Sequence, residues 1–376
     1  MSATSPESPD RGPVREHQTV VVAMSGGVDS SVAAALCVGA GHRVLGVMLR
    51  LWAEETAADG ANRCCAPDAL ADAAAVAETL GIPFSVIDAR ERFKSEVVDR
   101  FTASSAVGDT PNPCLGCNRR VRFGFLLDRA LALGADALVT GHYARLAPGA
   151  DGDVRLLRGV DREKDQSYVL SRLDQDQLAR ARFPLGEMHK SDVRRMAEEI
   201  GLHVSGRSDS VDLCWTGDGG VSGFLARHLP PGAARPGPIV DTAGRQVGEH
   251  RGLPYYTLGQ RRGLGLSQGR PVYVVGRSAD LNELVVGPAA ELDAVEVPTR
   301  DVHWISGVAP DSPIAVTAQV RYRAPAAPAE VVVGPGRTAV VRFAEPQLAP
   351  TPGQAVVFYD GDECLGGGII ASGEGG

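Results

Sequence analysis

Long apolar runs, cysteines and lysines are all scarce in this chain. No apolar run approaches the roughly 18 residues that a membrane-spanning helix needs, and residues 1–17 lack the apolar centre of a signal peptide. Seven cysteines in 376 residues are too few for a disulfide scaffold, and the adjacent pair Cys64 and Cys65 suits reduced thiols better. We therefore expect a cytoplasmic protein with no membrane partner and with reduced, reactive cysteines.

The overall composition is that of a folded protein with two or three domains. Hydrophobic residues make up 44% and charged residues 22% of the chain. The net charge of -8 speaks against a uniformly basic coat, but residues 245–277 carry six arginines and three tyrosines against one glutamate. Basic residues interleaved with aromatics suit an RNA backbone with unstacked bases, and a solvated barrel surface is an equal alternative.

Residues 18–205 alternate between short β-branched runs and longer amphipathic segments. The pattern predicts strands at 19–23, 43–49, 84–88 and 137–140, and helices at 30–40, 67–80, 91–105, 119–133 and 190–200. Such alternation is typical of an α/β fold with a doubly wound parallel sheet, which binds ligands at the carboxyl ends of its strands. Residues 1–17, rich in Ser, Pro and charge, predict a disordered leader.

After about Ser205 the helical periodicity fades, and short β-runs rich in flanking Gly and Pro follow one another. We expect this half to be all-β. It divides into a central β-rich domain at 206–287, which we expect to bind RNA, and a C-terminal β-barrel domain at 288–376.

A glycine loop, Met-Ser-Gly-Gly-Val-Asp-Ser-Ser at 24–31, lies between the first strand and the first helix. Such a loop places backbone N–H groups and the positive helix end around an anion. The lysine of a Walker loop is missing, which favours a pyrophosphate leaving group. Asp29 is a candidate ligand for Mg²⁺ on the phosphates. The alternative is a tight turn with a serine cap.

The segment SGGVDSS resembles the loop of the ATP pyrophosphatase (PP-loop) superfamily, whose members adenylate an acceptor and release pyrophosphate. Met48 ends the second strand and Gly141 follows a later one. Both positions lie where a PP-loop, adenine nucleotide hydrolase-like sheet would hold adenine and ribose, although both residues also suit simple packing.

Two cysteine segments are the next chemical signals. Cys114 and Cys117 follow a proline loop and precede a helix rich in arginines, which is typical of a reactive thiol. The C-x-x-C spacing also suits half a metal site, but a second such pair is missing, so no structural metal is expected. Cys214 lies in a polar, glycine-containing segment, as an exposed nucleophile on a movable loop would. Two separated reactive cysteines allow sulfur delivery.

Lysine is rare here, since only positions 94, 164 and 190 carry it among 38 basic residues. Lys164, in the run Lys-Asp-Gln-Ser-Tyr, is therefore a candidate for a point-charge role that arginine would not fill, with a solvated surface lysine as the alternative.

Together, the segments resemble the bacterial tRNA-specific 2-thiouridylase family over about residues 19–372. The resemblance rests on SGGVDSS, NPCLGCN, TGHYARL, KDQSYVL, FPLGEMHKSDVR, DSVDLCW, GEHRGLPYYTLGQRRGLGL, VRYR and PGQAVVFYDGDECLGGGII. It implies that sulfur is transferred to C2 of the wobble uridine, with ATP consumed and AMP and pyrophosphate released.

The resemblance also implies roles for residues at the matching positions. Cys117 would be the nucleophile and Cys214 the persulfide carrier, with a disulfide between them as sulfur leaves. The implied ATP site comprises Ala23, Met24, Ser25, Gly26, Gly27, Val28, Asp29, Ser30, Met48 and Gly141. The target base would contact Asn112, Pro113 and Cys114, and tRNA would contact Lys164, Asp165, Gln166, Arg321 and Tyr322. His142 and Gln354 would be supporting residues.

This sequence departs from the family pattern at two places. Some relatives have Asp where Cys114 stands, so Cys114 receives no catalytic task. Around Cys214, Val211-Asp212-Leu213 and Trp215 replace the usual Thr-Gly-Ile and Phe, which bears on the flexibility of that loop.

The implied chemistry defines the expected cofactors and partners. A uracil carbonyl oxygen is a very poor leaving group, so ATP with Mg²⁺ must first adenylate it. The base must leave its stack, which is least costly in the anticodon loop of tRNA. A sulfur-donor protein, either a sulfur relay protein or a cysteine desulfurase, would load Cys214. The alternatives are an iron–sulfur-dependent tRNA thiolase, another PP-loop adenylating ligase, and a non-catalytic RNA-binding protein.

Overall fold

The computed structural model describes residues 17–52, 54, 67–149, 152–207, 213–217, 219–266 and 271–372. The predictions for the leader up to residue 16, for Cys64 and Cys65, and for residues 208–212 before Cys214 lie outside these residues. No helix in the described part is both long and apolar enough to cross a membrane.

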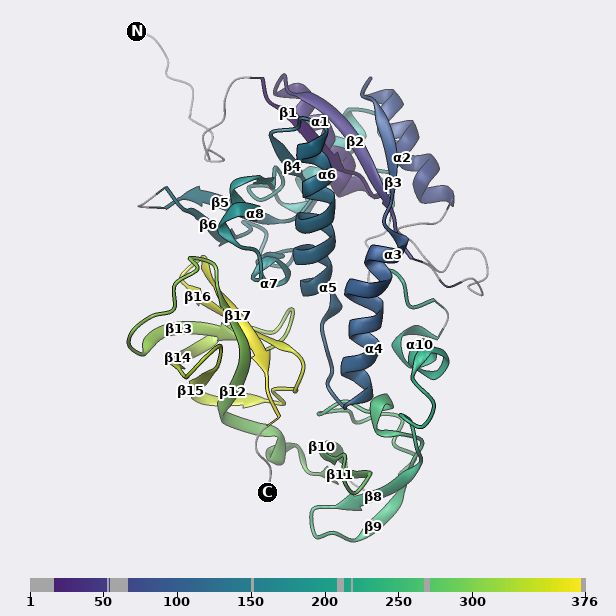
Figure 1. Cartoon of the computed structure of the whole chain (residues 1–376), viewed down its shortest axis with the longest axis vertical. Helices are drawn as coiled ribbons and strands as arrows, with labels where there is room; N and C mark the ends of the chain where they lie inside the picture. Colours follow the sequence, from purple (N-terminus) through teal and green to yellow (C-terminus); the bar gives the residue numbers. More distant parts are fainter. Residues whose placement is uncertain are drawn as a thin grey trace.

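The first domain is built on a five-stranded parallel sheet in the order β3-β2-β1-β4-β7. Figure 1 labels the first four of these strands. The strands of the sheet are β1 (Thr19–Ala23), β2 (Arg43–Arg50), β3 (Phe84–Asp88), β4 (Ala137–Val139) and β7 (Ala181–Arg182). Along β1, Val21 packs into one buried cluster while Val20 and Val22 pack into another. The sheet is thus covered on both faces, and the predicted doubly wound sheet is confirmed.

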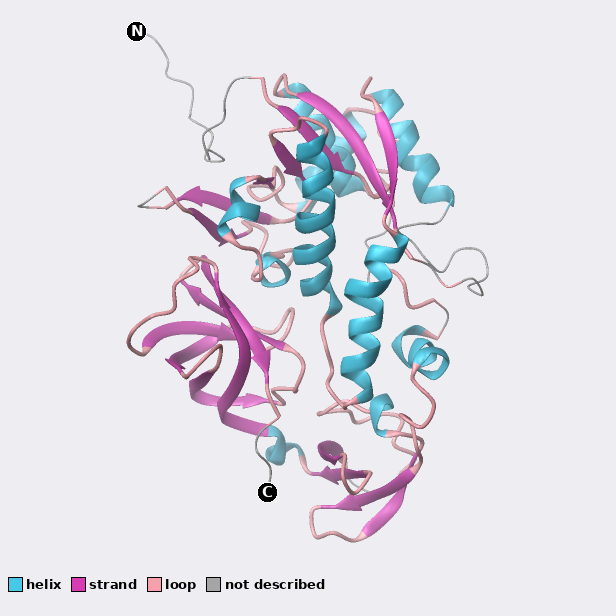
Figure 2. Cartoon of the chain, viewed as in Figure 1, coloured by secondary structure: helices cyan, strands magenta, loops and turns pink. Residues whose placement is uncertain are grey.

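Helices cover the sheet and connect its strands (Figure 2). They are α1 (Val28–Gly39), α2 (Pro67–Thr79), α3 (Arg90–Phe93), α4 (Asp99–Ala106), α5 (Pro113–Gly116), α6 (Leu127–Ala132), α7 (Ser167–Leu170), α8 (Gln175–Ala179) and α9 (Lys190–Glu199). Two π-helical stretches, η1 (Lys94–Val98) and η2 (Cys117–Leu126), join α3 to α4 and α5 to α6 into two continuous helices. Asn112 caps the second one, because its side-chain oxygen accepts the N–H of Cys114 at 3.1 Å.

The second half of the chain contains two further sheets. The central sheet has the order β10-β11-β8-β9, with β8 (Gly237–Asp241), β9 (Gln246–His250), β10 (Tyr273–Ser278) and β11 (Glu283–Gly287). The C-terminal strands are β12 (Asp293–Trp304), β13 (Ile314–Gln319), β14 (Ala327–Val333), β15 (Ala339–Leu348), β16 (Ala355–Asp360) and β17 (Glu363–Ile370). Because β12 pairs with both β15 and β17, these strands close into the predicted β-barrel.

The expectation that this half is all-β is wrong, because it contains the α-helix α10 (Gly220–His228). It also contains two short 3-10 turns, η3 (Leu253–Tyr255) and η4 (Ala289–Leu292). Two glycines weaken the local helical signal in α10. Tertiary packing stabilises the helix instead, because Phe224 is fully buried against Trp215, with ring centroids 4.7 Å apart.

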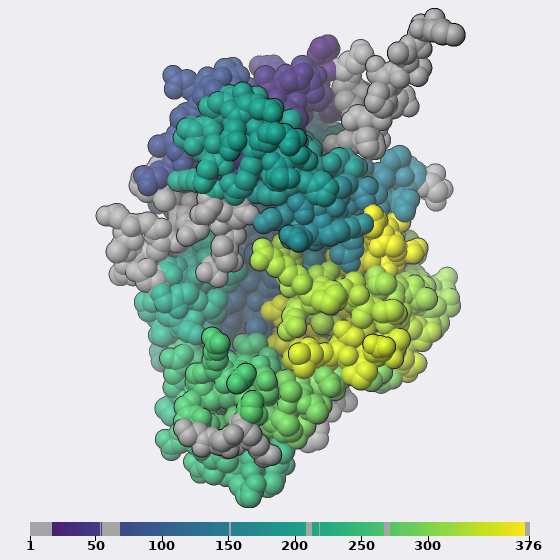
Figure 3. Space-filling model, turned by 180° about the vertical axis from the view of Figure 1, so that it is seen from behind, coloured from purple at the N-terminus to yellow at the C-terminus, as the bar shows by residue number. Residues whose placement is uncertain are grey.

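A hairpin joins the first domain to the barrel. It consists of β5 (Ala144–Pro148) and β6 (Val154–Arg158), and β6 pairs antiparallel with β17. Tyr168 of α7 is buried and donates to the carbonyl of Ala355 at 2.9 Å. In the view from behind, the yellow-green barrel packs directly against the blue-teal part of the first domain (Figure 3). The predicted domain boundaries at 205 and 287 stay predictions.

Candidate active site

A pocket of about 260 Å³ lies where β1, β2 and β4 end. This is the edge of a parallel sheet at which ligands bind. Seven of the ten residues predicted for the nucleotide line it, namely Ala23, Met24, Ser25, Asp29, Ser30, Met48 and Gly141. The other wall comes from η2 and from the barrel turn after β13, through Cys117, Arg122, Tyr322 and Arg323. The pocket therefore brings the predicted nucleotide loop and the predicted nucleophile together.

The glycine loop has the geometry of an anion cradle. Ser30 Oγ accepts the N–H of Ser25 at 3.1 Å and donates to the carbonyl of Gly27 at 3.1 Å, which fixes the turn at the start of α1. Gly26 has a φ of +73°, and a Cβ there would lie 2.3 Å from the carbonyl oxygen of Ala69. A Cβ on Gly141 would lie 2.8 Å from the backbone nitrogen of Ser30. Glycine at these positions lets the backbone close around the N-terminus of α1.

Asp29 is paired with a lysine rather than set in a cluster of oxygen ligands. Lys190 Nζ lies 2.7 Å from both carboxylate oxygens, and the Tyr143 hydroxyl donates to Oδ1 at 2.7 Å. Among the described residues lining the pocket, Asp29 is the only carboxylate. The described part of the chain contains no group of three or more His, Cys, Asp or Glu side chains placed to hold a metal. This donor set does not fit a protein-held Mg²⁺, so the magnesium role of Asp29 stays a prediction, and no step below is derived through it.

His142 is neutral in this site. Burial, and after it the charge of Arg122, lowers the pKa of His142 to about 3. Since a guanidinium only donates, His142 Nε2 accepts from Arg122 at 3.4 Å. The Nδ1–H of His142 then donates to Thr140 Oγ1 at 2.7 Å. His142 thus serves to hold Arg122 toward the pocket rather than to supply a proton at neutral pH.

The C-x-x-C segment is divided between two surfaces. Cys117, the first residue of η2, lines the pocket, whereas Cys114 is exposed. Asn112 and Pro113 line a different pocket, of about 280 Å³, on another face of the same helix. The three residues predicted to contact the target base thus do not line the pocket of Cys117, and their role stays a prediction.

Cys214 lies near the same helix but does not line the pocket. It is partly buried, whereas the sequence predicted an exposed nucleophile. Its neighbour Trp215 is buried edge-on against Phe101, with centroids 5.3 Å apart. Cys117 and Cys214 both pack against the apolar cluster that contains Trp215. The structure therefore places the two predicted sulfur-transfer cysteines on one cluster, with Cys214 outside the pocket.

The residues predicted to contact tRNA fall into two groups. Lys164, Gln166 and Tyr322 line the pocket. The side chain of Asp165 is only 7% exposed, and its oxygens accept from Arg158 and Ser167, at 3.1 and 2.9 Å.

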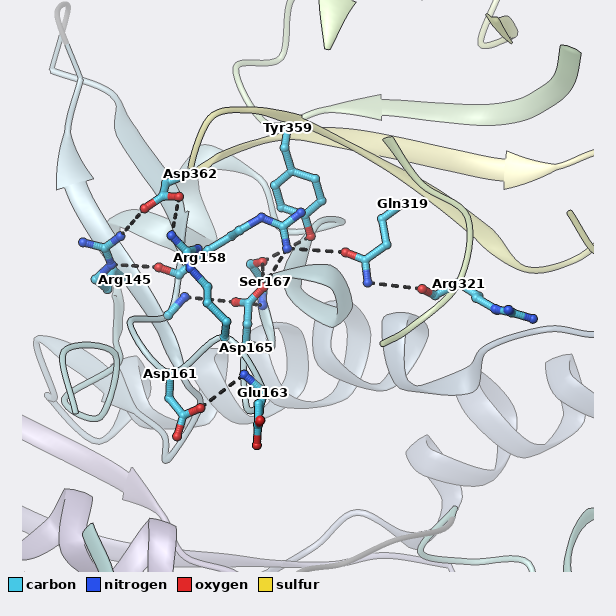
Figure 4. A network of polar contacts seen from close by, with 12 residues as sticks. Arg145, Arg158, Asp161, Glu163, Asp165, Ser167, Gln319, Arg321, Tyr359 and Asp362 are labelled. Atoms are coloured by element: carbon cyan, nitrogen blue, oxygen red, sulfur yellow. Dashed lines mark hydrogen bonds and ion pairs between the residues drawn. The ribbon is translucent and has the colours of Figure 1, made fainter. Parts of the chain in front are cut away.

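A polar network around Asp165 crosses from the first domain to the barrel. Figure 4 shows Arg158 reaching from Asp165 to the Tyr359 ring, 3.5 Å from its centroid, and to Gln319. Gln319 in turn donates to the carbonyl of Arg321 at 3.2 Å. Asp165 thus helps to hold the barrel turn that presents Tyr322, while the exposed Arg321 side chain lies outside the pocket lining.

Gln354, the other predicted supporting residue, donates to the carbonyl of Thr110 at 2.5 Å. It therefore ties the barrel to the start of the proline loop.

Some pocket residues were not predicted as site residues. The main ones are Arg122, Tyr143, Lys190 and Arg323. The rarity of lysine, which singled out Lys164, applies equally to Lys190 and could have identified it. Arg323 lies in the VRYR motif that supported the family resemblance, but only Arg321 and Tyr322 of this motif were predicted to contact tRNA.

Comparison with known families gives three matches along the chain. A model described as the tRNA methyl transferase HUP domain matches residues 18–218, a tRNA methyl transferase PRC-barrel domain matches 222–288, and an aminomethyltransferase beta-barrel domain matches 296–370. The tRNA-specific 2-thiouridylase MnmA of Magnetococcus marinus is 46% identical over 94% of this chain and 99% of its own. The protein of the same name from Chloroflexus aurantiacus is 48% identical over 94% of this chain and 98% of its own.

The chain belongs to the tRNA-specific 2-thiouridylase family. The resemblance drawn from the motifs is thereby confirmed. One solved structure to which this thiouridylase family member is similar is far more distant. The chain of a 4-thiouridine synthetase–RNA complex with bound ATP is 17% identical, with a TM-score of 0.35 over 51% of this chain and 43% of that chain, which is too distant to decide a function.

Proposed function

We propose that this protein transfers sulfur to C2 of the wobble uridine of tRNA in the pocket at the carboxyl edge of the parallel sheet, with ATP as the activator. One observation carries the proposal: the glycine loop of Ser25 and Ser30 and the side chain of Cys117 line the same pocket. An enzyme that adenylates an oxygen and then replaces it with sulfur needs these two groups on either side of one carbon.

The nucleotide half of the reaction is assigned to the loop and to Lys190. The loop N–H groups and the N-terminus of α1 would bind the pyrophosphate part of ATP. Lys190, held by Asp29 and only 10% exposed, would supply the positive charge next to the departing pyrophosphate.

The sulfur half of the reaction is assigned to the two cysteines. A sulfur-donor protein would load Cys214 as a persulfide. The terminal sulfur attacks C2, and AMP leaves with the former carbonyl oxygen. The thiolate of Cys117 then attacks Sγ of Cys214, which releases 2-thiouridine and forms a Cys117–Cys214 disulfide. An external dithiol reduces this disulfide before the next cycle.

The tRNA contacts are assigned to Lys164, Gln166 and Tyr322, which line the pocket around the incoming base. Asp165 would act by positioning this segment and the barrel turn. In the central domain, Arg277 is partly buried and donates to the carbonyl of Tyr256 at 2.8 Å, so it serves the fold. The exposed Arg261 and Arg262 are the better candidates for RNA contact in the basic stretch.

The test is reconstitution of the reaction with tRNA, ATP and a sulfur donor. Cys117→Ser and Cys214→Ser should each abolish 2-thiouridine while AMP formation survives. Cys37→Ala is the matched control, because Cys37 is buried on α1, away from the pocket lining. Full thiouridine formation by either serine variant would contradict the proposal. Bound iron in the active protein would favour the iron–sulfur alternative.

A further inference from the structure

A second pocket is strongly basic and lies beside the helix that carries Cys117. It has a volume of about 280 Å³ and is enclosed by η1 and α4, by the segment from Pro111 to Arg120, and by the barrel at β12 and Gly353. Its lining contains two carboxylates, Glu96 and Asp301, and five arginines: Arg100, Arg119, Arg120, Arg172 and Arg300. We call it the arginine pocket.

The few carboxylates at the arginine pocket are each shared between several arginines. Glu96 alone pairs with three, since Arg92, Arg100 and Arg120 lie 3.4, 3.1 and 3.0 Å from its oxygens. Such sharing leaves positive charge without a compensating anion.

The barrel side shows the same imbalance. Asp301 pairs with both Arg172 and Arg337, and Arg300 pairs with Asp109. Seven arginines thus face three carboxylates, so the cluster retains an excess of positive charge.

Arg119 is the arginine best placed to take an external anion. It is half-buried, and its side chain has no hydrogen-bond or ion-pair partner among the described residues. Its backbone is fixed, because Gln177 Nε2 donates to the Arg119 carbonyl at 2.8 Å. Burial, followed by the charges of Arg100 and Arg119 and partly offset by Glu96, lowers the pKa of Arg120. Packing like charges this closely is unfavourable, and Glu96 offsets this repulsion only in part.

The arginine pocket also lies next to the residues predicted to meet the target base. Asn112 and Pro113 line it, and Gly116, which precedes Cys117, lines it too. On the proposed function, a strand whose target base enters the pocket of Cys117 would pass the end of this helix and would bring a neighbouring phosphate to the arginines.

We propose that the arginine pocket binds a backbone phosphate of the RNA strand beside the target nucleotide, with Arg119 as the main contact. The choice of RNA as the source of the phosphodiester rests on the proposed function. A guanidinium matches a phosphate through paired N–H donors, and such contacts fix the register of a nucleic acid without reading its sequence.

The first test measures binding of an unmodified anticodon stem–loop RNA as a function of salt. Removing one phosphate contact in Arg119→Gln should weaken binding severalfold and lower the slope of log affinity against log salt by about 0.7 to 0.9. Arg119→Lys should restore most of the slope, since it keeps the charge. The control is Arg195→Gln, an exposed arginine on α9 that pairs with Asp192 at 2.7 Å. Affinity and slope equal to those of the control would overturn the proposal.

The second test locates the phosphate. Uncharged methylphosphonates are placed one at a time around the wobble uridine. At one position the substitution should weaken RNA binding by the wild type, and at that position it should not further weaken RNA binding by Arg119→Gln. Independent, additive losses at every position would overturn the proposal. If Arg119→Gln loses affinity while the wild type binds RNA but forms no thiouridine, the arginine pocket stands and the proposed function fails.

Discussion

Replacement of Lys190 is the sharpest probe of the nucleotide site. Lys190→Met removes the charge that lies 2.7 Å from both oxygens of Asp29 and leaves this carboxylate facing the phosphates of ATP. A hydrogen bond to a charged group contributes about 1.5 to 3 kcal/mol, which corresponds to a roughly 10- to 150-fold loss in kcat/KM for ATP. Lys190→Arg should recover only part of the loss, because the pair with Asp29 is partly buried and compact.

The assay is tRNA-dependent release of AMP and pyrophosphate at varied ATP. Lys94 provides a matched control, since Lys94 pairs with Asp99 at the same 2.7 Å but is 49% exposed and lies on η1. Lys94→Met should change kcat/KM by less than twofold, as surface ion pairs contribute little. Equal rates for Lys190→Met and Lys94→Met, with both proteins folded, would refute the assignment of Lys190 to the pyrophosphate.

Three further predictions concern stability and loop geometry. Because the pKa of His142 is about 3 when folded and ordinarily 6.5, the unfolded chain gains a proton that the folded chain lacks as pH falls below 6.5. As the pH falls from 7 to 5.5, the free energy of unfolding measured with urea should therefore decrease by roughly 1 kcal/mol more for the wild type than for His142→Asn. An equal decrease in both proteins would disprove the assignment of this pH dependence to His142. Tyr168→Phe should lower the free energy of unfolding by about 1 to 2 kcal/mol, since it leaves the buried carbonyl of Ala355 without its donor; an unchanged urea midpoint would contradict this. Gly26→Ala should weaken ATP binding, measured by calorimetry, more than tenfold, because φ is +73° at Gly26 and a Cβ there would lie 2.3 Å from a carbonyl oxygen of α2. Gly27→Ala should weaken ATP binding less, since the nearest atom to a Cβ at Gly27 is 3.6 Å away.

Those parts of the fold that rest on local pattern were predictable. The strands β1 and β3 begin and end where the β-branched runs do, and the glycine loop lies at the carboxyl end of β1. The closed barrel follows from the short β-runs and turns. The helix α10 was missed because its stability comes from Phe224 packing against Trp215, a contact between neighbouring segments that helical propensity does not reveal.

The parts of the site that were not predicted depend on contacts between residues that are distant in sequence. Asp29 and Lys190 are 161 residues apart and meet only because α1 and α9 pack side by side. Which face of a helix meets which pocket is also decided by packing, so the sequence could not separate Asn112 from Cys117. The partial burial of Cys214 follows in the same way from the aromatic cluster around Trp215.

The claim at the centre of this account is that sulfur passes from Cys214 to the base beside Cys117. The most direct measurement is mass spectrometry of the unreduced protein after one turnover with tRNA, ATP and a persulfide on Cys214. The account predicts a disulfide between Cys117 and Cys214 in a one-to-one ratio with the 2-thiouridine formed. Stoichiometric 2-thiouridine with both cysteines still recovered as thiols would contradict it.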